Sequence, residues 1–275
     1  MNCLSCRGLF SAKYENEYLS RRLKEIFGTR QLKDSLVPVQ VVAVDLNRNK
    51  PVYFSTLDTP NVLMVDAALA TTAAPTFFPV HHFKLNTVYY YCIDGGVCEN
   101  NPVASALKQA NKFIFKKNNT TVDEHKFKVV SIGTGYVARS LDIKGLSNAG
   151  KIKWAPEIIE IAIDATSFLA DVHTKELFHS SGAKENYFRL QIPIAESDSK
   201  LDNSRQENLS KLRSSTDSFV SHDENYKAML EKLKAPLTLS EHNRSLINDR
   251  DFDDLEIEMH SAQGEIDEND LAPSS

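Results

Sequence analysis

The stretch YYYCIDGGVCENNP, residues 89–102, contains the densest set of structural signals in this chain of 275 residues. Its first part, residues 89–93, is short, apolar and β-forming, which predicts a strand. Asp94-Gly95-Gly96 then predicts a sharp turn, because glycine tolerates positive φ and lets other backbone approach closely. A carboxylate at the end of a strand is thereby placed at a fixed position.

Working outward, Asn101 is a favoured N-cap residue and Pro102 is favoured at the first helical position, which predicts an amphipathic helix over residues 102–115. Apolar periodicity predicts the other elements. The predicted strands are residues 37–46, 51–54, 127–132 and 187–192, and the predicted helices are residues 14–27, 62–74 and 154–178.

Strands that alternate with helices predict an α/β fold of three layers, with a largely parallel sheet and helices on both faces. We expect one domain over residues 1–195, a polar helical extension over 196–236, and an acidic, disordered tail over 237–275. Active sites of such folds lie at the carboxyl ends of the strands. Two glycine turns follow predicted strands, at residues 94–96 and 133–135.

Three motifs carry a resemblance to a known family. Residues 67–79, AALATTAAPTFFP, resemble the helix-and-turn signature of patatin-like phospholipases, with Thr72 where the family usually has Ser. IDGGV at residues 93–97, with the following Asn-Asn-Pro, resembles the family's Asp-Gly-Gly/Ala motif and helix start. VSIGTG at residues 130–135 is similar to the strand end that comes next, and Asp45 also matches. The order of the motifs is that of the family, and the match covers roughly residues 9–190 by eye.

The resemblance implies a Ser–Asp dyad that acts on fatty-acyl esters, phospholipids above all, at a membrane surface to which the protein binds peripherally. A serine hydroxyl is a weak nucleophile until a base takes its proton. In this family an aspartate is that base, so Asp94 is the implied catalytic residue, in a turn made by Gly95 and Gly96. Such a mechanism requires no metal and no cofactor. The competing interpretation, that Asp94 only forms a common Asp-Gly turn, is disfavoured by the flanking motifs.

The nucleophile is the open question. The family places its Gly-rich oxyanion loop and its Gly-x-Ser-x-Gly elbow before the helix that residues 14–27 match, and no Gly-x-Ser-x-Gly occurs in the chain. The nearest sequence, GLSNAG at residues 145–150, has one residue too many and no strand directly before it. Ser5, Ser11 and Ser131 also lack the elbow context.

We therefore expect a patatin-like domain that is incomplete at its N-terminal side, inactive alone and prone to aggregate through an exposed sheet edge. An N-terminal fragment acting in trans is one expected partner. The alternative hypothesis is a non-enzymatic pseudoenzyme, a remnant that binds lipid or a protein partner.

Charge and composition exclude other classes. Residues 241–275 hold 11 acidic and two basic residues, so a net of −9 lies in the tail and +4 in the remainder. Without an arginine-rich stripe interleaved with aromatics, we expect no nucleic-acid partner. The chain has no standard secretion signal and no membrane-spanning apolar run. A cytoplasmic location is therefore the default, with other export routes left open.

Three weaker signals in the sequence concern other kinds of site. Cys3 and Cys6 have C-x-x-C spacing but no second pair, so reduced thiols are expected in place of a metal or redox site. His81 and His82 would face opposite sides of a strand, and a surface loop is the favoured interpretation. The glycine turn at residues 133–135 lacks the third glycine and the lysine of a nucleotide loop.

Overall fold

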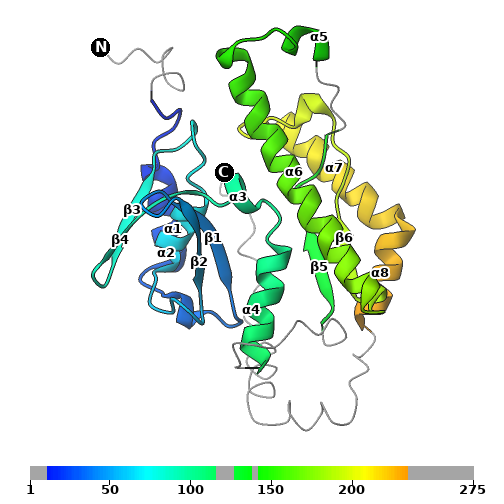
Figure 1. Cartoon of the computed structure of the whole chain (residues 1–275), viewed down its shortest axis with the longest axis horizontal. Helices are drawn as coiled ribbons and strands as arrows, with labels where there is room; N and C mark the ends of the chain where they lie inside the picture. The colour runs from blue at the N-terminus through cyan, green and yellow to red at the C-terminus, as the bar shows by residue number, and fades with distance from the viewer. Residues whose placement is uncertain (1–10, 116–126, 138–141, 235–275) are drawn as a thin grey trace, which may run out of the picture. The chain divides into compact units, whose positions relative to one another are not determined.

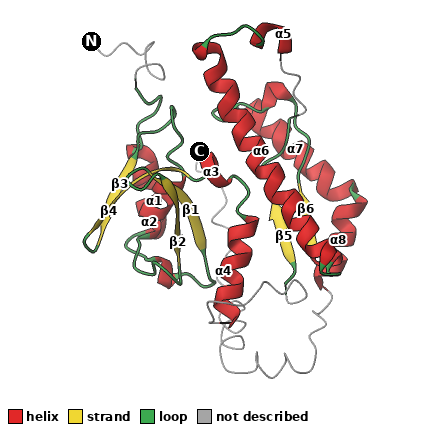
Figure 2. Cartoon of the chain, viewed as in Figure 1, coloured by secondary structure: helices red, strands yellow, loops and turns green. Residues whose placement is uncertain are grey.

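The computed structural model describes residues 11–115, 127–137 and 142–234 (Figure 1). Its contacts divide the chain into two compact units. The first ends at Gly95 and the second begins at Gly96, so the Asp94 turn falls at the junction between them. Both units contain helices and strands (Figure 2), which confirms the mixed α/β class. The three-layer arrangement, with helices on both faces of a sheet, stays a prediction.

The first unit is built on a four-stranded sheet in the order β2-β1-β4-β3. Its strands are β1 (Gln40–Asp45), β2 (Lys50–Ser55), β3 (His81–Leu85) and β4 (Val88–Asp94). All three neighbouring pairs are antiparallel. β4, which ends at Asp94, is an inner strand between β1 and β3.

This antiparallel sheet corrects the expectation of a largely parallel one. The physical reason lies in the connections, because strands joined by a tight turn must run in opposite directions. Residues 46–49 form the turn between β1 and β2, and residues 86–87 form the turn between β3 and β4. β3 itself was not predicted: His81 and His82 lie in this strand, and the expected surface loop is wrong.

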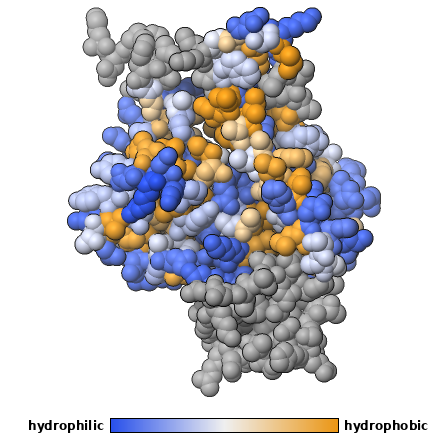
Figure 3. Space-filling view, in the orientation of Figure 1, coloured by the Kyte–Doolittle hydropathy of each residue, from blue (hydrophilic) through white to orange (hydrophobic). Residues whose placement is uncertain are grey.

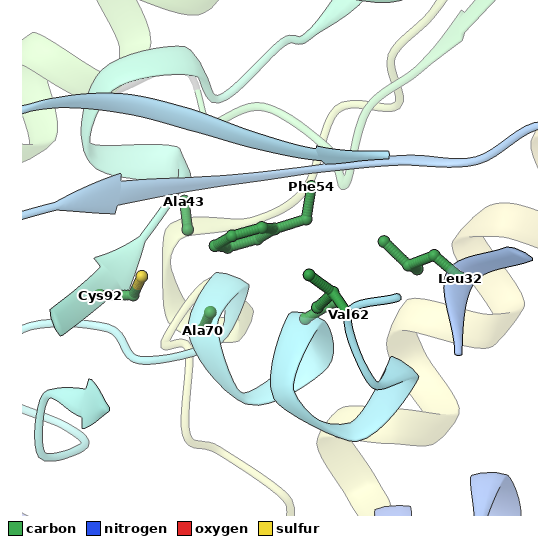
Figure 4. Close-up of a cluster of buried hydrophobic side chains, with 7 residues drawn as sticks. Leu32, Ala43, Phe54, Val62, Ala70 and Cys92 are labelled. Carbon is green, nitrogen blue, oxygen red and sulfur yellow. The ribbon is translucent and has the colours of Figure 1, made fainter. Parts of the chain in front are cut away.

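The helices α1 (Glu17–Phe27) and α2 (Met64–Thr71) complete the first unit, with α2 packed against β1, β3 and β4, and α1 packed against α2. Apolar side chains from α2, the strands and the connecting loops form the core (Figure 4). Its buried members are Leu32, Ala43, Phe54, Val62, Ala67, Ala70 and Cys92. Ala67 and Ala70 lie one turn apart, so the small side chains of α2 let the helix approach the sheet closely.

Aromatic rings fill the space beside this core. The Phe54 ring meets the rings of Phe83 and Tyr90 edge-on, with centroids 5.4 Å away in both pairs. Tyr90 points toward the core, whereas Tyr89 and Tyr91 are exposed, because side chains alternate between the faces of a strand. The tyrosine run of β4 is thus core on one face and surface on the other.

The second unit holds one parallel pair of strands and most of the helices. Its elements are α3 (Gly96–Glu99), α4 (Val103–Phe115), β5 (Val129–Ile132), α5 (Ile143–Leu146), α6 (Lys151–Ser180), β6 (Tyr187–Leu190), α7 (Gln206–His222) and α8 (Glu224–Lys234). β5 and β6 pair in parallel. A long connection that includes α6 makes this direction possible, as parallel pairs require a crossover.

The core of the second unit lies where α4, α6, β6 and the start of β5 meet. Its buried members are Val103, Leu107, Phe127, Phe178, Ala183 and Tyr187. The helical region predicted beyond the last strand forms α7 and α8, which are separated at Asp223. Among the helices that the structure describes, none is both long and apolar enough to span a bilayer.

Candidate active site

Asp94 is the last residue of β4, and its backbone is held on two sides. It lies opposite Ala43 of β1 in the antiparallel register. Its N–H donates a hydrogen bond of 3.0 Å to the carbonyl oxygen of Ala73, which follows α2. Asp94 is half-buried. Strand pairing and the helix end therefore fix where the Asp94 backbone leaves the sheet.

Gly95 follows in a space that excludes any side chain. A Cβ atom on Gly95 would lie 2.3 Å from the carbonyl oxygen of Val42 and 2.7 Å from its carbonyl carbon. The same Val42 carbonyl accepts a hydrogen bond of 2.6 Å from the hydroxyl of Thr71, the last residue of α2. One peptide group of β1 thus contacts both the end of α2 and the turn after Asp94. Glycine is required here by close backbone approach.

Two of the three motifs that suggested a patatin-like protein therefore meet in the first unit. Ala73 belongs to the predicted helix-and-turn signature and binds the Asp94 amide. Thr72, the position usually occupied by serine, donates its hydroxyl to the carbonyl of Ala68 at 2.7 Å, which satisfies the helix end. Thr76 has a φ of 72°, so the chain turns sharply after α2.

Asp45, the other matching aspartate, has a structural role. Its side chain is 1% exposed and accepts the N–H of Asn47 at 3.0 Å. The Arg48 guanidinium forms an ion pair with this carboxylate and lies over the Tyr90 ring, 5.1 Å from the centroid. A buried carboxylate requires such a partner. Asp45 is thus committed to holding the turn between β1 and β2.

The buried Cys92 lies opposite Asp45 in the sheet. Burial, and next the negative charge of Asp45, raise the pKa of the Cys92 thiol from 9.0 to about 12, although Arg48 lowers it. The folded state then keeps a proton that the unfolded chain loses above pH 9. The thiol's contribution to stability is therefore complete below pH 9 and is lost as the pH rises from 9 toward 12.

We predict that the free energy of unfolding falls by about 1 kcal/mol more between pH 8 and pH 10 in the wild-type chain than in Cys92→Ala. Urea unfolding of both proteins at the two pH values measures the difference. The raised pKa of Tyr187, caused first by burial and then by Asp171, affects both proteins equally and cancels. An identical pH dependence in the two proteins would contradict the prediction.

The second unit contains a buried polar network just downstream of the Asp94 turn. Asn101, which precedes α4, is 2% exposed, and its amide oxygen accepts the Ser131 hydroxyl at 2.8 Å. The Arg189 guanidinium in turn donates to the Ser131 hydroxyl oxygen at 2.9 Å. The Asn101 amide nitrogen also donates to the Ser167 carbonyl in α6 at 3.4 Å. Asn101 thereby connects the start of α4 to β5 and α6.

We predict that Asn101→Ala lowers the free energy of unfolding by about 1–3 kcal/mol, because the buried Ser131 hydroxyl loses its acceptor. Asn100→Ala is the matched control, since Asn100 is exposed and adjacent. Urea midpoints of the two variants make the comparison. Equal loss in both would show that the network contributes nothing beyond local propensity.

The network also defines the role of Ser131, which is buried in β5. Its hydroxyl is engaged by Asn101 and Arg189, so the structure gives it a bridging role. Arg189 was not singled out from the sequence. The signal that identifies it is a charged side chain within the short apolar strand at residues 187–192, since buried charges are paired.

The second glycine turn is closed by a side chain. The Gln191 amide accepts the Gly135 N–H at 3.3 Å and donates to the Gly135 carbonyl at 3.2 Å. The Gly133 N–H donates to the Leu190 carbonyl at 2.9 Å. Two backbone donors that a phosphate would need are therefore already used, which agrees with the weak nucleotide signal.

The other residues considered from the sequence that the structure describes have contacts of their own. Ser147 ends α5 and donates to the Lys144 carbonyl, so it lies on no strand-to-helix elbow. His81 contacts Asp66 at 3.1 Å, while the His82 ring stacks on Tyr91. No group of three or more His, Cys, Asp or Glu side chains suited to a metal occurs among the described residues. Cys3, Ser5 and Cys6 lie outside the described residues, as does the acidic tail.

Comparison with known proteins shows what kind of domain holds this turn. Residues 4–107 match the model of the family described as patatin-like phospholipase. The chain belongs to the patatin-like family. The matched segment of this patatin-like chain contains both motifs that meet at Asp94.

Three relatives of the patatin-like chain illustrate the extent of the likeness. Patatin-like protein 2 of Oryza sativa subsp. indica is 30% identical over 225 residues, 73% of this chain and 56% of that protein. Patatin-like protein 1 of Arabidopsis thaliana is 28% identical over 229 residues, 74% of this chain and 55% of that protein. Patatin group D-2 of Solanum tuberosum is 26% identical over 200 residues, which are 66% of this chain and 52% of that protein. The chain spans about half the length of the curated relatives it matches.

Proposed function

We propose that this chain supplies the aspartate base, Asp94, of a Ser–Asp lipid acyl hydrolase of the phospholipase A type. The observation that carries the proposal is the fixed backbone of Asp94 at the end of an inner strand. Its N–H is hydrogen-bonded to the Ala73 carbonyl, and the next residue is a glycine whose Cβ would clash with the Val42 carbonyl. A base that acts on a serine must have a fixed position, because proton transfer requires hydrogen-bond distance. Asp45 is excluded from the role by its ion pair with Arg48.

The chemistry follows from the two groups. The carboxylate of Asp94 takes the serine proton while the serine oxygen bonds to the acyl carbon of a fatty-acyl ester. The proton then passes to the departing alcohol, and water releases the fatty acid in a second step. Backbone N–H groups of a glycine-rich loop stabilise the oxyanion. Asp94, Gly95 and Gly96 are the site residues that this chain contributes.

The serine comes from a segment outside these 275 residues, since the chain contains no Gly-x-Ser-x-Gly. That segment belongs either to the same polypeptide or to a partner in trans. The substrates are phospholipids or other fatty-acyl esters, and the proposal requires no metal and no cofactor.

The test is to join the chain, on its N-terminal side, to a Gly-x-Ser-x-Gly segment from a patatin-like relative. We expect the joined protein to hydrolyse a short-chain fatty-acyl ester and a phospholipid, and the chain by itself to hydrolyse neither. Serine-dependent hydrolysis by the 275-residue chain alone would contradict the proposal. A folded joined protein without activity would favour the non-enzymatic alternative.

A further inference from the structure

The long helix α6 exposes an apolar face that no described residue of the second unit covers. Six of its exposed residues are apolar and recur at steps of three and four, which places them on one face of the helix, whereas Ile159 and Glu160 are exposed outside that set. This outer face consists of Ile158, Ile161, Ala162, Ala165, Phe168 and Leu169. Ile158 is 57% exposed and Phe168 is 65% exposed. In the view of Figure 3, apolar residues gather over part of α6.

The opposite face of α6 is the one that packs. Thr174 and Phe178 are buried, and Ala170 lies against the core that contains Phe178. One face of α6 is therefore packed within its own unit, and the other presents exposed apolar residues. Contiguous exposed apolar surface marks an interaction site.

We propose that the outer face of α6 is the surface by which this protein docks on a neutral phospholipid bilayer. The choice of lipid as the occupant rests on the proposed function. Three observations on α6 carry it: the contact of the helix with α3, the tryptophan at its start, and the charge along its flank.

The first observation is position. α6 packs against α3. The short helix α3 begins at Gly96, directly after Asp94 and Gly95. The helix that carries the outer face is thus in contact with the segment that continues from the proposed base.

The second observation is Trp154, the single tryptophan of the chain. Trp154 lies four residues before Ile158 and seven before Ile161, so it shares the outer face. It is half-buried. Tryptophan favours the boundary between hydrocarbon and water, because its ring is apolar and its N–H is polar. The outer face therefore ends in a residue suited to the headgroup level of a bilayer.

The third observation is charge. Glu157 and Asp164 lie seven residues apart along one flank of the outer face, and Asp164 is exposed. Phosphatidylcholine presents a cationic ammonium at the bilayer surface that these carboxylates can meet, whereas an anionic surface would repel them. A second copy of the helix, packed antiparallel, would bring the two acidic flanks together and is disfavoured for the same reason.

The experiment uses the whole 275-residue chain with phosphatidylcholine vesicles. We expect the chain to float with the vesicles and the emission of Trp154 to shift to shorter wavelength. Phe168→Asp lowers the partition coefficient at least about tenfold, because a charge replaces a phenyl ring that enters the bilayer on docking. Leu201→Asp is the matched control: Leu201 is 77% exposed, lies outside α6, and takes on the same charge without loss of binding.

A second variant and a second lipid composition distinguish docking on a neutral bilayer from charge effects and from self-association. Phe168→Ser, which adds no charge, lowers binding less than Phe168→Asp but still measurably. Vesicles with added phosphatidylserine bind no better than phosphatidylcholine alone. Unchanged Trp154 emission, or equal binding by Phe168→Asp and Leu201→Asp, overturns the proposal. Self-association that Phe168→Asp abolishes, without vesicle binding, assigns the face to a second copy and also overturns it.

The outcome is independent of the catalytic test. Asp94→Asn leaves vesicle binding unchanged, since Asp94 lies outside the outer face. Vesicle binding without hydrolysis in the joined protein would therefore refute the dyad and keep the docking surface. Hydrolysis without vesicle binding would refute the docking surface and keep the dyad.

Discussion

Asp94→Asn lowers kcat for fatty-acyl ester hydrolysis by about 10²–10⁴-fold in the protein joined to its serine-bearing segment. The substitution keeps the size of the side chain but removes the ability to take the serine proton. The backbone contacts of Asp94, its pairing with Ala43 and its bond to Ala73, do not involve the carboxylate. We therefore expect the fold and KM to change little, which is the pattern for a group that acts in the transition state.

Asp142→Asn is the control for this variant. Asp142 caps α5 by accepting the Gly145 N–H at 2.9 Å, and asparagine caps helices equally well. The control loses the same charge in a place without catalytic chemistry, so its kcat stays at the wild-type value. A joined protein whose activity falls equally in both variants would point to a general effect of charge, and Asp94 would lose its role.

Gly95→Ser lowers the free energy of unfolding by at least about 3 kcal/mol. The new Cβ would lie 2.3 Å from a main-chain oxygen, and main-chain atoms of an inner strand cannot rotate away as a side chain can. β1 and β4 must separate, which also weakens the hydrogen bond from Thr71 to the Val42 carbonyl. Urea unfolding followed by circular dichroism measures the loss.

Gly150→Ser is the matched control for Gly95. Gly150 precedes α6, and a Cβ there meets nothing within 4 Å. Serine is also favoured at this N-cap position. We expect the control to keep wild-type stability or to gain slightly. Equal stability of Gly95→Ser and Gly150→Ser would show that the turn after Asp94 relaxes easily, contrary to the geometry described.

The turn after Asp94 was predictable because glycine pairs after a strand are a local signal. The reason for Gly95 was not, since the atom it avoids belongs to Val42, more than fifty residues away, and no sequence pattern encodes a backbone contact. The same holds for Arg189, whose partners come from two other segments. The local sequence predicts the turn, but the need for glycine at residue 95 is explained only by its packing against Val42 in the folded protein.

The prediction of strand direction was wrong for a related reason. β3 was missed because His81 and His82 begin it and polar residues interrupt its apolar alternation. Without β3, the hairpin that makes this part of the sheet antiparallel could not be seen. α6 shows the complementary limit: its periodicity predicted a helix correctly, but apolar residues on both faces do not reveal which face the protein buries.

The reactivity of the elbow serine tests the central claim most directly. A fluorophosphonate reacts when the serine oxygen bonds to phosphorus, fluoride leaves, and the base takes the serine proton. In the joined protein, we predict that the second-order rate of this labelling, followed by intact mass, falls at least about 100-fold in Asp94→Asn. Equal labelling rates in the wild-type protein and Asp94→Asn would contradict the account, because the serine would then be activated without Asp94.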